Sequence, residues 1–269
     1  MYKMDYHLHS DYSMDTPTPM RAMCEAAVRT GLDEICFTEH TEMGHPDPHS
    51  NTPPDVKKWL AEIEEMRRAF PMLVIRAGIE VGDNPLCRDA VKRWHSALPL
   101  DFMLLSLHLI DNQDPYFRTY YDGKTQCQAY RRYAESKLES VLAWEASEYD
   151  AMAHLGYIAK FAPYPAAERP LRYAHAPEAF DALFEALAKA GKALEINTSG
   201  YRSMREFLPD RELLMRFRAC GGEFVTLGSD AHLPEHVGGK LDDAQQLARE
   251  CGFRYALTFE KRKAIQHLL

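Results

Sequence analysis

Short apolar runs of strand length alternate with longer segments of helical periodicity along nearly the whole chain. The apolar runs predict strands near residues 2–8, 34–39, 72–80, 102–107, 150–155, 193–197, 223–228 and 254–258. The helical segments predict helices near residues 18–31, 55–69, 85–97, 125–147, 176–190, 210–220, 241–250 and 259–267. Repeated βα units of this number close most naturally into a barrel, with an open doubly wound sheet as the alternative.

Two segments interrupt the alternation, "TEMGHPDPHSNTPP" at 41–54 and "IDNQDPYFRTYYDGKT" at 110–125. Both are rich in Pro, Gly, Asp and Asn, and each follows a predicted strand, where α/β enzymes carry loops that cover a substrate. No shift of composition marks a domain boundary. The sequence therefore predicts one domain over residues 1–269.

Residues with metal-binding side chains gather at the downstream ends of the predicted strands, where barrel active sites are assembled. His7 and His9 share one face of the first strand, about 7 Å apart, because side chains alternate along a strand. The later strands end in further ligand types: His40, Glu80, His108, His154, and the pair Asp230 and His232. The sixth strand ends in "EINTSG", whose polar residues after Ile196 are not strong ligands: Asn197, Thr198 and Ser199.

Each of these residues alone is weak evidence, because a single buried histidine is more often a hydrogen-bonded structural residue than a ligand. The coincidence is what carries weight, since half of the twelve histidines fall at these few positions. The other six are expected to be solvated, the first, second and fifth of them being weak loop candidates: His45, His49, His95, His175, His236 and His267. Glu39 alternates away from His40 and is interpreted either as a support for a metal ligand or as structural, whereas Asp5 is a candidate to orient an imidazole.

This number of ligand groups exceeds what one tetrahedral zinc site needs, which favours two or three ions that share a bridging carboxylate. Glu80 is the natural bridge. Imidazole and carboxylate ligands without a thiolate suit Zn²⁺, Fe²⁺ or Mn²⁺ and do not choose among them.

Charge and cysteine content narrow the class of partner. The 32 basic and 40 acidic residues give a formal charge of −8, which disfavours a nucleic acid partner and favours a small substrate. The six cysteines form no C-x-x-C pair and are expected to be reduced thiols. No apolar leader and no long apolar segment appear, so we expect a cytoplasmic protein without a membrane partner.

The motifs "HLH", "TEH", "GIE", "SLH", "AHLG" and "SDAH", in this order, resemble the polymerase-and-histidinol-phosphatase (PHP) family of metal-dependent phosphoesterases. The resemblance runs from His7 to His232 and implies a distorted (β/α)7 TIM-like barrel with a trinuclear metal site at the carboxyl ends of its strands. It implies a first ion on His7, His9, Glu80 and Asp230, a second on Glu80, His108 and His154, and a third on Asp15, His40 and His232. Asp15 enters by resemblance alone.

Within that family, the length, the insertion after strand four and the helix "QAYRRYAESKLESV" are similar to the histidinol-phosphate phosphatases of histidine biosynthesis. The stretch after His154 departs from the pattern of that group, because Gly156 stands where an acid is expected. Lys160 keeps the basic position. The departure bears on the substrate more than on the metals.

The resemblance implies that a phosphomonoester dianion bridges the ions and that a hydroxide between two metals attacks phosphorus in line. The catalytic candidates are Glu80, Asp230 and His232, and Asp230, His232 or His40 could assist the leaving alkoxide. The sequence contains no G-x-S-x-G elbow, no P-loop and no Cys-x5-Arg signature that would supply another mechanism. Positive charge for the substrate is expected from Arg202 and Lys160, with lesser candidates in Arg172 and Arg205, and the loop aromatics at 117–121 could cover an imidazole.

Three functions are open at this point. The first is a small-molecule phosphomonoesterase, preferentially for histidinol phosphate. The second is a PHP-type phosphoesterase or exonuclease for nucleotides or oligonucleotides, which calls for a basic groove that the charge of −8 disfavours. The third is a non-catalytic, metal-stabilised binding module, against which the complete set of nine ligand positions argues.

Overall fold

The computed structural model describes residues 2–51 and 53–269, so that Thr52 of the predicted loop 41–54 and Met1 lie outside the described residues. Nine strands follow one another in a single sheet in the order of the sequence. They are β1 (Met4–Leu8), β2 (Glu34–Thr41), β3 (Val74–Gly82), β4 (Phe102–Ser106), β5 (Ala151–Met152), β6 (Ala193–Asn197), β7 (Phe224–Gly228), β8 (Tyr255–Glu260) and β9 (Lys263–Leu268). Neighbours from β1 to β8 are parallel, and β9 pairs antiparallel with β8.

The first and seventh strands adjoin and bring the two ends of the seven-strand series together. Leu8 forms a parallel bridge with Ala231, just beyond the end of β7. The backbone N–H of His9 donates to the carbonyl of Ala231 at 3.0 Å, and that of Ala231 donates to His7 at 3.3 Å. β8 pairs with β7 only at Phe224 and Val225, the first two residues of β7. The arrangement is therefore a distorted barrel and not a regular one.

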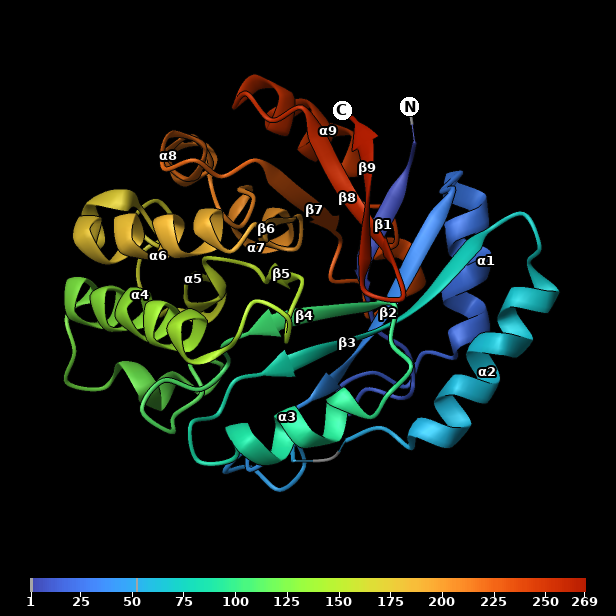
Figure 1. The fold of residues 1–269 in the computed structure, drawn as a ribbon. Helices are drawn as coiled ribbons and strands as arrows, with labels where there is room; N and C mark the ends of the chain where they lie inside the picture. Colours follow the sequence, from blue (N-terminus) through green and yellow to red (C-terminus); the bar gives the residue numbers. More distant parts are fainter. Residues whose placement is uncertain (1, 52) are drawn as a thin grey trace.

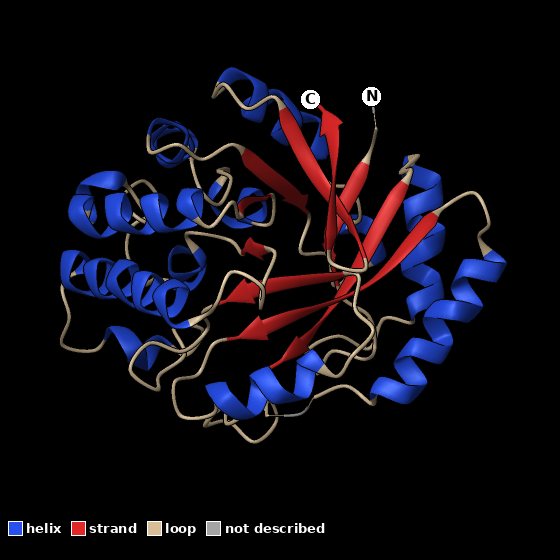
Figure 2. Cartoon of the chain, viewed as in Figure 1, coloured by secondary structure: helices blue, strands red, loops and turns tan. Residues whose placement is uncertain are grey.

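Helices surround the sheet and follow its strands, as Figure 1 and Figure 2 show. The α-helices are α1 (Met20–Thr30), α2 (Val56–Ala69), α3 (Arg88–Ser96), α4 (Gln126–Ala143), α5 (Tyr157–Phe161), α6 (Pro177–Lys189), α7 (Gly200–Met204), α8 (Arg211–Ala219) and α9 (Leu241–Glu250). Short 3₁₀ helices are η1 (Arg118–Tyr121), η2 (Tyr173–His175) and η3 (Pro234–His236). The predicted α/β alternation is confirmed, while the short helices α5 and α7 were not anticipated.

Amphipathic faces explain why the long helices form where they do. In α6, Phe180, Leu183, Phe184 and Leu187 recur at helical spacing, and all four are buried. α4 begins at a capping box, in which the Thr125 hydroxyl accepts from the backbone of Gln128 and the Gln128 side chain accepts from the Thr125 N–H. Burial of such faces against the sheet positions the strand ends that carry the candidate site.

The predicted helix at 259–267 is wrong. Residues 263–268 form β9, which turns back on β8 through Lys261 and Arg262, both in the left-handed region with φ of 49° and 65°. A two-residue turn of this kind matches the twist of an antiparallel hairpin. Asp101 supports it, because its carboxylate accepts from the Lys261 N–H at 3.0 Å and its carbonyl from the Arg262 N–H at 2.9 Å.

The described residues share one buried core, and the assignment of residues 1–269 to one domain stays a prediction. Within the part of the chain that the structure describes, no helix is both long enough and apolar enough to cross a membrane.

Candidate metal centre

Glu80 lies at the centre of the residues that the strand ends bring together. Its Oε2 is 3.1 Å from His7 Nε2 and 3.1 Å from His40 Nδ1. Its Oε1 is 2.7 Å from His154 Nε2 and 3.2 Å from His108 Nε2. A single carboxylate therefore touches histidines from four strand ends, which is the arrangement expected of a bridging ligand.

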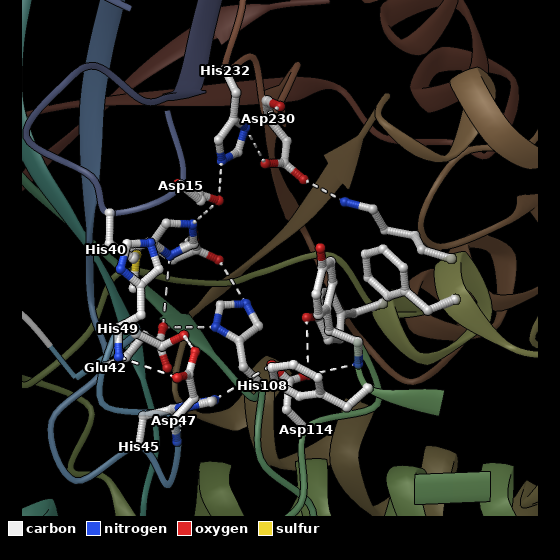
Figure 3. A pocket seen from close by; sticks show the side chains of 18 of the residues that line it. Asp15, His40, Glu42, His45, Asp47, His49, His108, Asp114, Asp230 and His232 are labelled. Carbon is white, nitrogen blue, oxygen red and sulfur yellow. Dashed lines mark hydrogen bonds and ion pairs between the residues drawn. The ribbon is translucent and has the colours of Figure 1, made fainter. Parts of the chain in front are cut away.

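Asp230 and Asp15 extend the cluster toward His232, as Figure 3 shows for the labelled residues. Asp230 Oδ1 is 3.7 Å from His9 Nε2 and 3.6 Å from His232 Nδ1. Asp15 Oδ2 is 2.9 Å from His232 Nε2 and 3.5 Å from His40 Nε2. The loop residue that only the resemblance suggested thus lies beside the residues found from the strand pattern.

Four triads have ligand atoms mutually within 4.8 Å: His9, His40 and His232; His7, His9 and Asp230; His7, Glu80 and His154; and His40, Glu80 and His108. These triads overlap and follow the implied division into three ions only in part. His9 replaces Asp15 in the first triad, and the group expected around Glu80, His108 and His154 is shared between the last two. The donor set nevertheless offers several adjoining positions for cations.

The chemistry of the donors fits metal ions. His9 is fully buried, and its Nε2 has no hydrogen-bond partner among the described residues, although it points toward Glu80 Oε2 at 3.5 Å. Burial, the first cause, lowers the pKa of His9 well below its usual value and that of His154 to about 4, which favours the neutral form of these two imidazoles. Against the same effect of burial, the surrounding carboxylates raise the pKa of His7, His40 and His108, and a cation in place of their protons would meet the same negative charge. Neutral imidazole is the form that binds a metal.

The carboxylates keep their charge despite burial. Burial alone would raise the pKa of Glu80, but His7, His40 and His108 hold it well below its usual value. Burial likewise opposes the charge of Asp230, while Lys160 and neighbouring histidines lower its pKa well below the ordinary range. Ionised carboxylates among imidazole nitrogens form a site that attracts divalent cations.

A cavity of about 590 Å³ opens over this cluster. Its walls combine the candidate ligands with carboxylates, aromatic rings and one lysine: Met14, Asp15, His40, Glu42, His45, Asp47, His49, Ser50, Glu80, His108, Asp114, Tyr116, Phe117, His154, Tyr157, Lys160, Phe161, Asp230 and His232. Ligands are thus accessible from one side, which is typical of catalytic and not of closed structural metal sites.

Of the two predicted substrate-binding cations, only Lys160 lines the cavity. Its Nζ lies 3.0 Å from Asp230 Oδ2. Arg202 on α7 donates instead to the backbone carbonyls of Ser229 and Asp230, at 2.9 and 3.0 Å. Because both guanidinium contacts are made to the loop beneath the site, Arg202 supports the backbone of Asp230 and does not reach the cavity in this structure.

Two carboxylates that the sequence analysis missed contact candidate ligands. Glu195 Oε1 is 2.6 Å from His7 Nδ1, and Glu42 Oε1 is 2.7 Å from His108 Nδ1. The signals were available, since Glu42 follows His40 with strand spacing and Glu195 precedes Asn197 with the same spacing.

The predicted role of Asp5 is wrong. Its carboxylate accepts from the backbone N–H groups of Ser229 and Gly238, at 2.8 and 3.0 Å, and touches no imidazole. Glu39 accepts from the hydroxyls of Ser10 and Ser13, and the Ser13 hydroxyl lies 3.1 Å from His9 Nδ1, so both interpretations of Glu39 agree with its contacts.

The six histidines expected to be solvated behave differently from one another. His95 is buried and stacks on Trp144 with ring centroids 5.5 Å apart, so the prediction of a solvated side chain is wrong there. It is also wrong for His45, which is buried and lies 3.4 Å from Asp114 through Nε2.

The aromatic residues of the loop that follows β4 have different positions. Phe117 lines the cavity, whereas Tyr121 packs inward and donates to the carbonyl of Ile158 at 2.5 Å.

A distorted parallel barrel with a histidine and carboxylate cluster at its carboxyl end defines the class: an α/β barrel with a candidate multinuclear metal centre. The sequence matches the family model described as PHP domain over residues 5–199. The chain therefore belongs to the PHP family.

Relatives match nearly the whole chain. It is 32% identical over 267 residues to the histidinol-phosphatase of Lactococcus lactis subsp. lactis (strain IL1403), an alignment covering 98% of this chain and 96% of that protein. A probable histidinol-phosphatase of Clostridium acetobutylicum is 26% identical and is aligned over 96% of this chain and 97% of that one.

Solved structures share the fold. The crystal structure of histidinol phosphate phosphatase from Lactococcus lactis subsp. lactis Il1403, complexed with zinc, L-histidinol and phosphate, has a TM-score of 0.89 at 30% identity and covers 98% of both chains. The putative histidinol phosphatase of Listeria monocytogenes has a TM-score of 0.74 at 17% identity, over 90% of this chain and 99% of that one. The predicted TIM-like α/β class is confirmed by this likeness.

Proposed function

We propose that the protein is a metal-dependent phosphomonoesterase that hydrolyses L-histidinol phosphate to L-histidinol and phosphate. The observation that carries the proposal is the cluster around Glu80, at the base of a cavity whose size suits a small ligand. The proposed substrate comes from the relatives. One Lactococcus lactis relative is named histidinol-phosphatase, and the similar crystal structure from Lactococcus lactis contains zinc, L-histidinol and phosphate.

The proposed ligands are nine side chains, divided among three ions as the family resemblance implies: His7, His9, Asp15, His40, Glu80, His108, His154, Asp230 and His232. Divalent ions bound there would offset the negative charge of the phosphoryl group and lower the pKa of water. The zinc of the Lactococcus lactis structure favours Zn²⁺ among the candidates Zn²⁺, Fe²⁺ and Mn²⁺.

Lys160 is the proposed phosphate-binding side chain. It lines the cavity, and its ammonium group already faces a carboxylate oxygen of Asp230 at 3.0 Å. A phosphate oxygen beside Asp230 would take the place of that contact. Arg202 is proposed to act indirectly, because it holds the Ser229 and Asp230 carbonyls.

His232 is proposed to assist the departure of the alkoxide as a ligand of the third ion. Its side chain is 25% exposed at the cavity and lies 2.9 Å from Asp15 through Nε2. A cation held by these two residues would stabilise the negative charge on the leaving oxygen.

The outer part of the cavity fits a cationic, imidazole-bearing alcohol. Asp47 and Asp114 provide carboxylates, and Tyr116, Phe117 and Phe161 provide aromatic surface. Carboxylates pair with an ammonium group, and rings pack against an imidazole.

The same lining disfavours oligonucleotides. Lys160 is the one lysine or arginine among the described lining residues, which include six Asp and Glu side chains. A polyanionic backbone needs several cations along its path. The cavity also disfavours a non-catalytic, metal-stabilised module, because such a module does not need metal ligands that are accessible to a substrate.

The substrate comparison tests this proposal. Protein of measured metal content is assayed with L-histidinol phosphate, p-nitrophenyl phosphate and a single-stranded oligonucleotide. We expect kcat/KM for histidinol phosphate to exceed the others by about 100-fold or more, because binding at the far end of the cavity is realised only with this substrate. Preference for the oligonucleotide would overturn the substrate and leave the metal ligands untouched.

A further inference from the structure

Glu42 and Glu195 are two buried carboxylates that the proposed metal sites do not use. Both side chains are almost fully inaccessible, and each approaches the outer nitrogen of a candidate ligand. Glu195 Oε1 is 2.6 Å from His7 Nδ1, and Glu42 Oε1 is 2.7 Å from His108 Nδ1. The opposite ring nitrogens, Nε2 in both histidines, face Glu80 at 3.1 and 3.2 Å.

Each imidazole lies between two carboxylates, and the contact at Nδ1 is the shorter one. A carboxylate can only accept, so an imidazole that donates from Nδ1–H to the outer carboxylate has Nε2 left for a cation at the centre. The outer carboxylates therefore hold His7 and His108 in the orientation in which Nε2 faces the proposed ions.

Each carboxylate also lies near a second candidate ligand. Glu195 Oε2 accepts from the backbone N–H of His154 at 2.6 Å. Glu42 Oε1 lies 3.7 Å from His40 Nδ1. The histidines at two strand ends, His108 directly and His154 through its backbone, thus depend on these carboxylates, and both belong to the ion proposed at Glu80, His108 and His154.

Two glycines make room for the carboxylates. A Cβ atom at Gly82 would lie 1.9 Å from Glu42 Oε2, and one at Gly228 would lie 2.3 Å from Glu195 Oε1 and 2.5 Å from the Cβ of His7. Neither glycine has a positive φ, so any residue could adopt its backbone conformation. These glycines therefore contribute space at the ends of β3 and β7 that a side chain would otherwise fill.

We propose that Glu42 and Glu195 are positioning residues for the metal ligands, each admitted by a glycine recess at Gly82 and Gly228. The proposal deepens the proposed function and rests on its metal centre. It assigns to the two carboxylates an effect on metal affinity, strongest for the ion at Glu80, His108 and His154.

Equilibrium dialysis against buffered free Zn²⁺, with bound metal measured by mass spectrometry, tests this directly. We expect Glu42→Leu and Glu195→Leu to weaken one binding step by about 10- to 100-fold, the usual effect of losing such a partner. Glu42→Gln should recover part of the affinity, because its carbonyl oxygen still accepts from His108. Gly82→Ala should resemble Glu42→Leu, since the methyl group displaces the carboxylate.

Glu34→Gln is the matched control, because Glu34 is also buried and hydrogen-bonded but lies at the other end of β2. It should leave every binding step unchanged. Circular dichroism of the metal-free proteins verifies folding, and Gly82→Ala and Glu42→Gln carry the test if a leucine variant does not fold. Wild-type affinity in Glu42→Leu and Gly82→Ala would overturn the proposal. The measurement uses no substrate, so inactivity of a normally metallated wild type would refute the proposed function alone.

Discussion

The barrel holds two buried polar clusters, one at each end of its strands, and they are built differently. At the amino end, Glu34 accepts from the hydroxyls of Tyr6 and Tyr2 at 2.5 and 2.8 Å and pairs with Arg76 Nε at 2.8 Å. The hydroxyl of Tyr6 in turn accepts from the Phe259 N–H at 2.8 Å. Each acceptor there meets a donor at hydrogen-bonding distance.

At the carboxyl end, the contacts around Glu80 and Asp230 join carboxylates and imidazoles, several at 3.5 to 3.8 Å. His9 Nε2 has no hydrogen-bond partner among the described residues. A cluster completed by its own hydrogen bonds stabilises the fold, whereas an incomplete one is completed by a ligand. The amino end is therefore the stability cluster and the carboxyl end the candidate metal cluster.

The largest effect that separates the two clusters is expected at the central carboxylate. Glu80→Gln should lower kcat/KM for histidinol phosphate by about 1000-fold or more, because a bridging ligand is lost and cations are no longer held in place. Steady-state kinetics with metal analysis measures this. Retention of activity within tenfold would contradict the role of Glu80.

Metal removal should destabilise the protein strongly. Saturating ions at 1000 times their Kd contribute about 4 kcal/mol to the folding free energy for each site, through preferential binding to the native state. Chemical denaturation with and without a chelator gives this difference. An unfolding midpoint that does not respond to chelation would separate the cluster from metal binding.

Disruption of the amino-end cluster should affect stability without affecting metals. Glu34→Gln leaves Arg76 with a weaker partner in a buried position, and we expect a loss of about 3 kcal/mol in the free energy of unfolding. Metal content and kcat of the folded protein should equal those of the wild type. A fall in bound metal would mean that the two ends are coupled.

Loss of the cavity cation should have a moderate effect on catalysis. Lys160→Met should raise KM for phosphomonoesters by about 10- to 100-fold, since one charge-assisted contact with phosphate is lost. Arg202→Met is the comparison, because it should alter metal binding through Asp230 before it alters KM. An unchanged KM in Lys160→Met would remove Lys160 from the substrate site.

The smallest effect concerns pH and lies outside both clusters. Burial, helped by Arg262 and Lys92, lowers the pKa of His95 to about 4, so its imidazole is neutral in the fold and gains a proton more readily when unfolded. Stability should fall by about 1 kcal/mol as the pH drops from about 6.5 to about 5.5, because the unfolded state binds the extra proton in this range. Denaturation at several pH values should show a shallower dependence in His95→Phe, and an identical slope would contradict this.

The candidate ligands at the strand ends could be predicted because the signals are local. Period two along a strand places His7 and His9 together, and the βα order brings the ends of parallel strands to one edge. Asp15 could not be predicted from this pattern, because it lies in the loop between β1 and α1, where side chains follow no regular alternation. Family resemblance supplied it, and the structure places it 2.9 Å from His232.

What the sequence did not reveal depends on contacts between distant segments. Glu195 meets His7 because β6 and β7 lead the chain back to β1, and Gly228 leaves room for that contact. The hairpin at 260–263 relies on Lys261 and Arg262 in left-handed conformations that these residues do not favour. Asp101, far away in the chain, holds that turn.

Metal restoration tests the proposed metal-dependent hydrolysis most directly. Protein stripped by a chelator is titrated with Zn²⁺ or Mn²⁺ while bound metal and hydrolysis of L-histidinol phosphate are measured on the same samples. We expect no measurable hydrolysis without metal, and activity that rises only as the cluster fills toward three ions per chain. Undiminished hydrolysis by the metal-free protein would show that the cluster is not the catalytic centre.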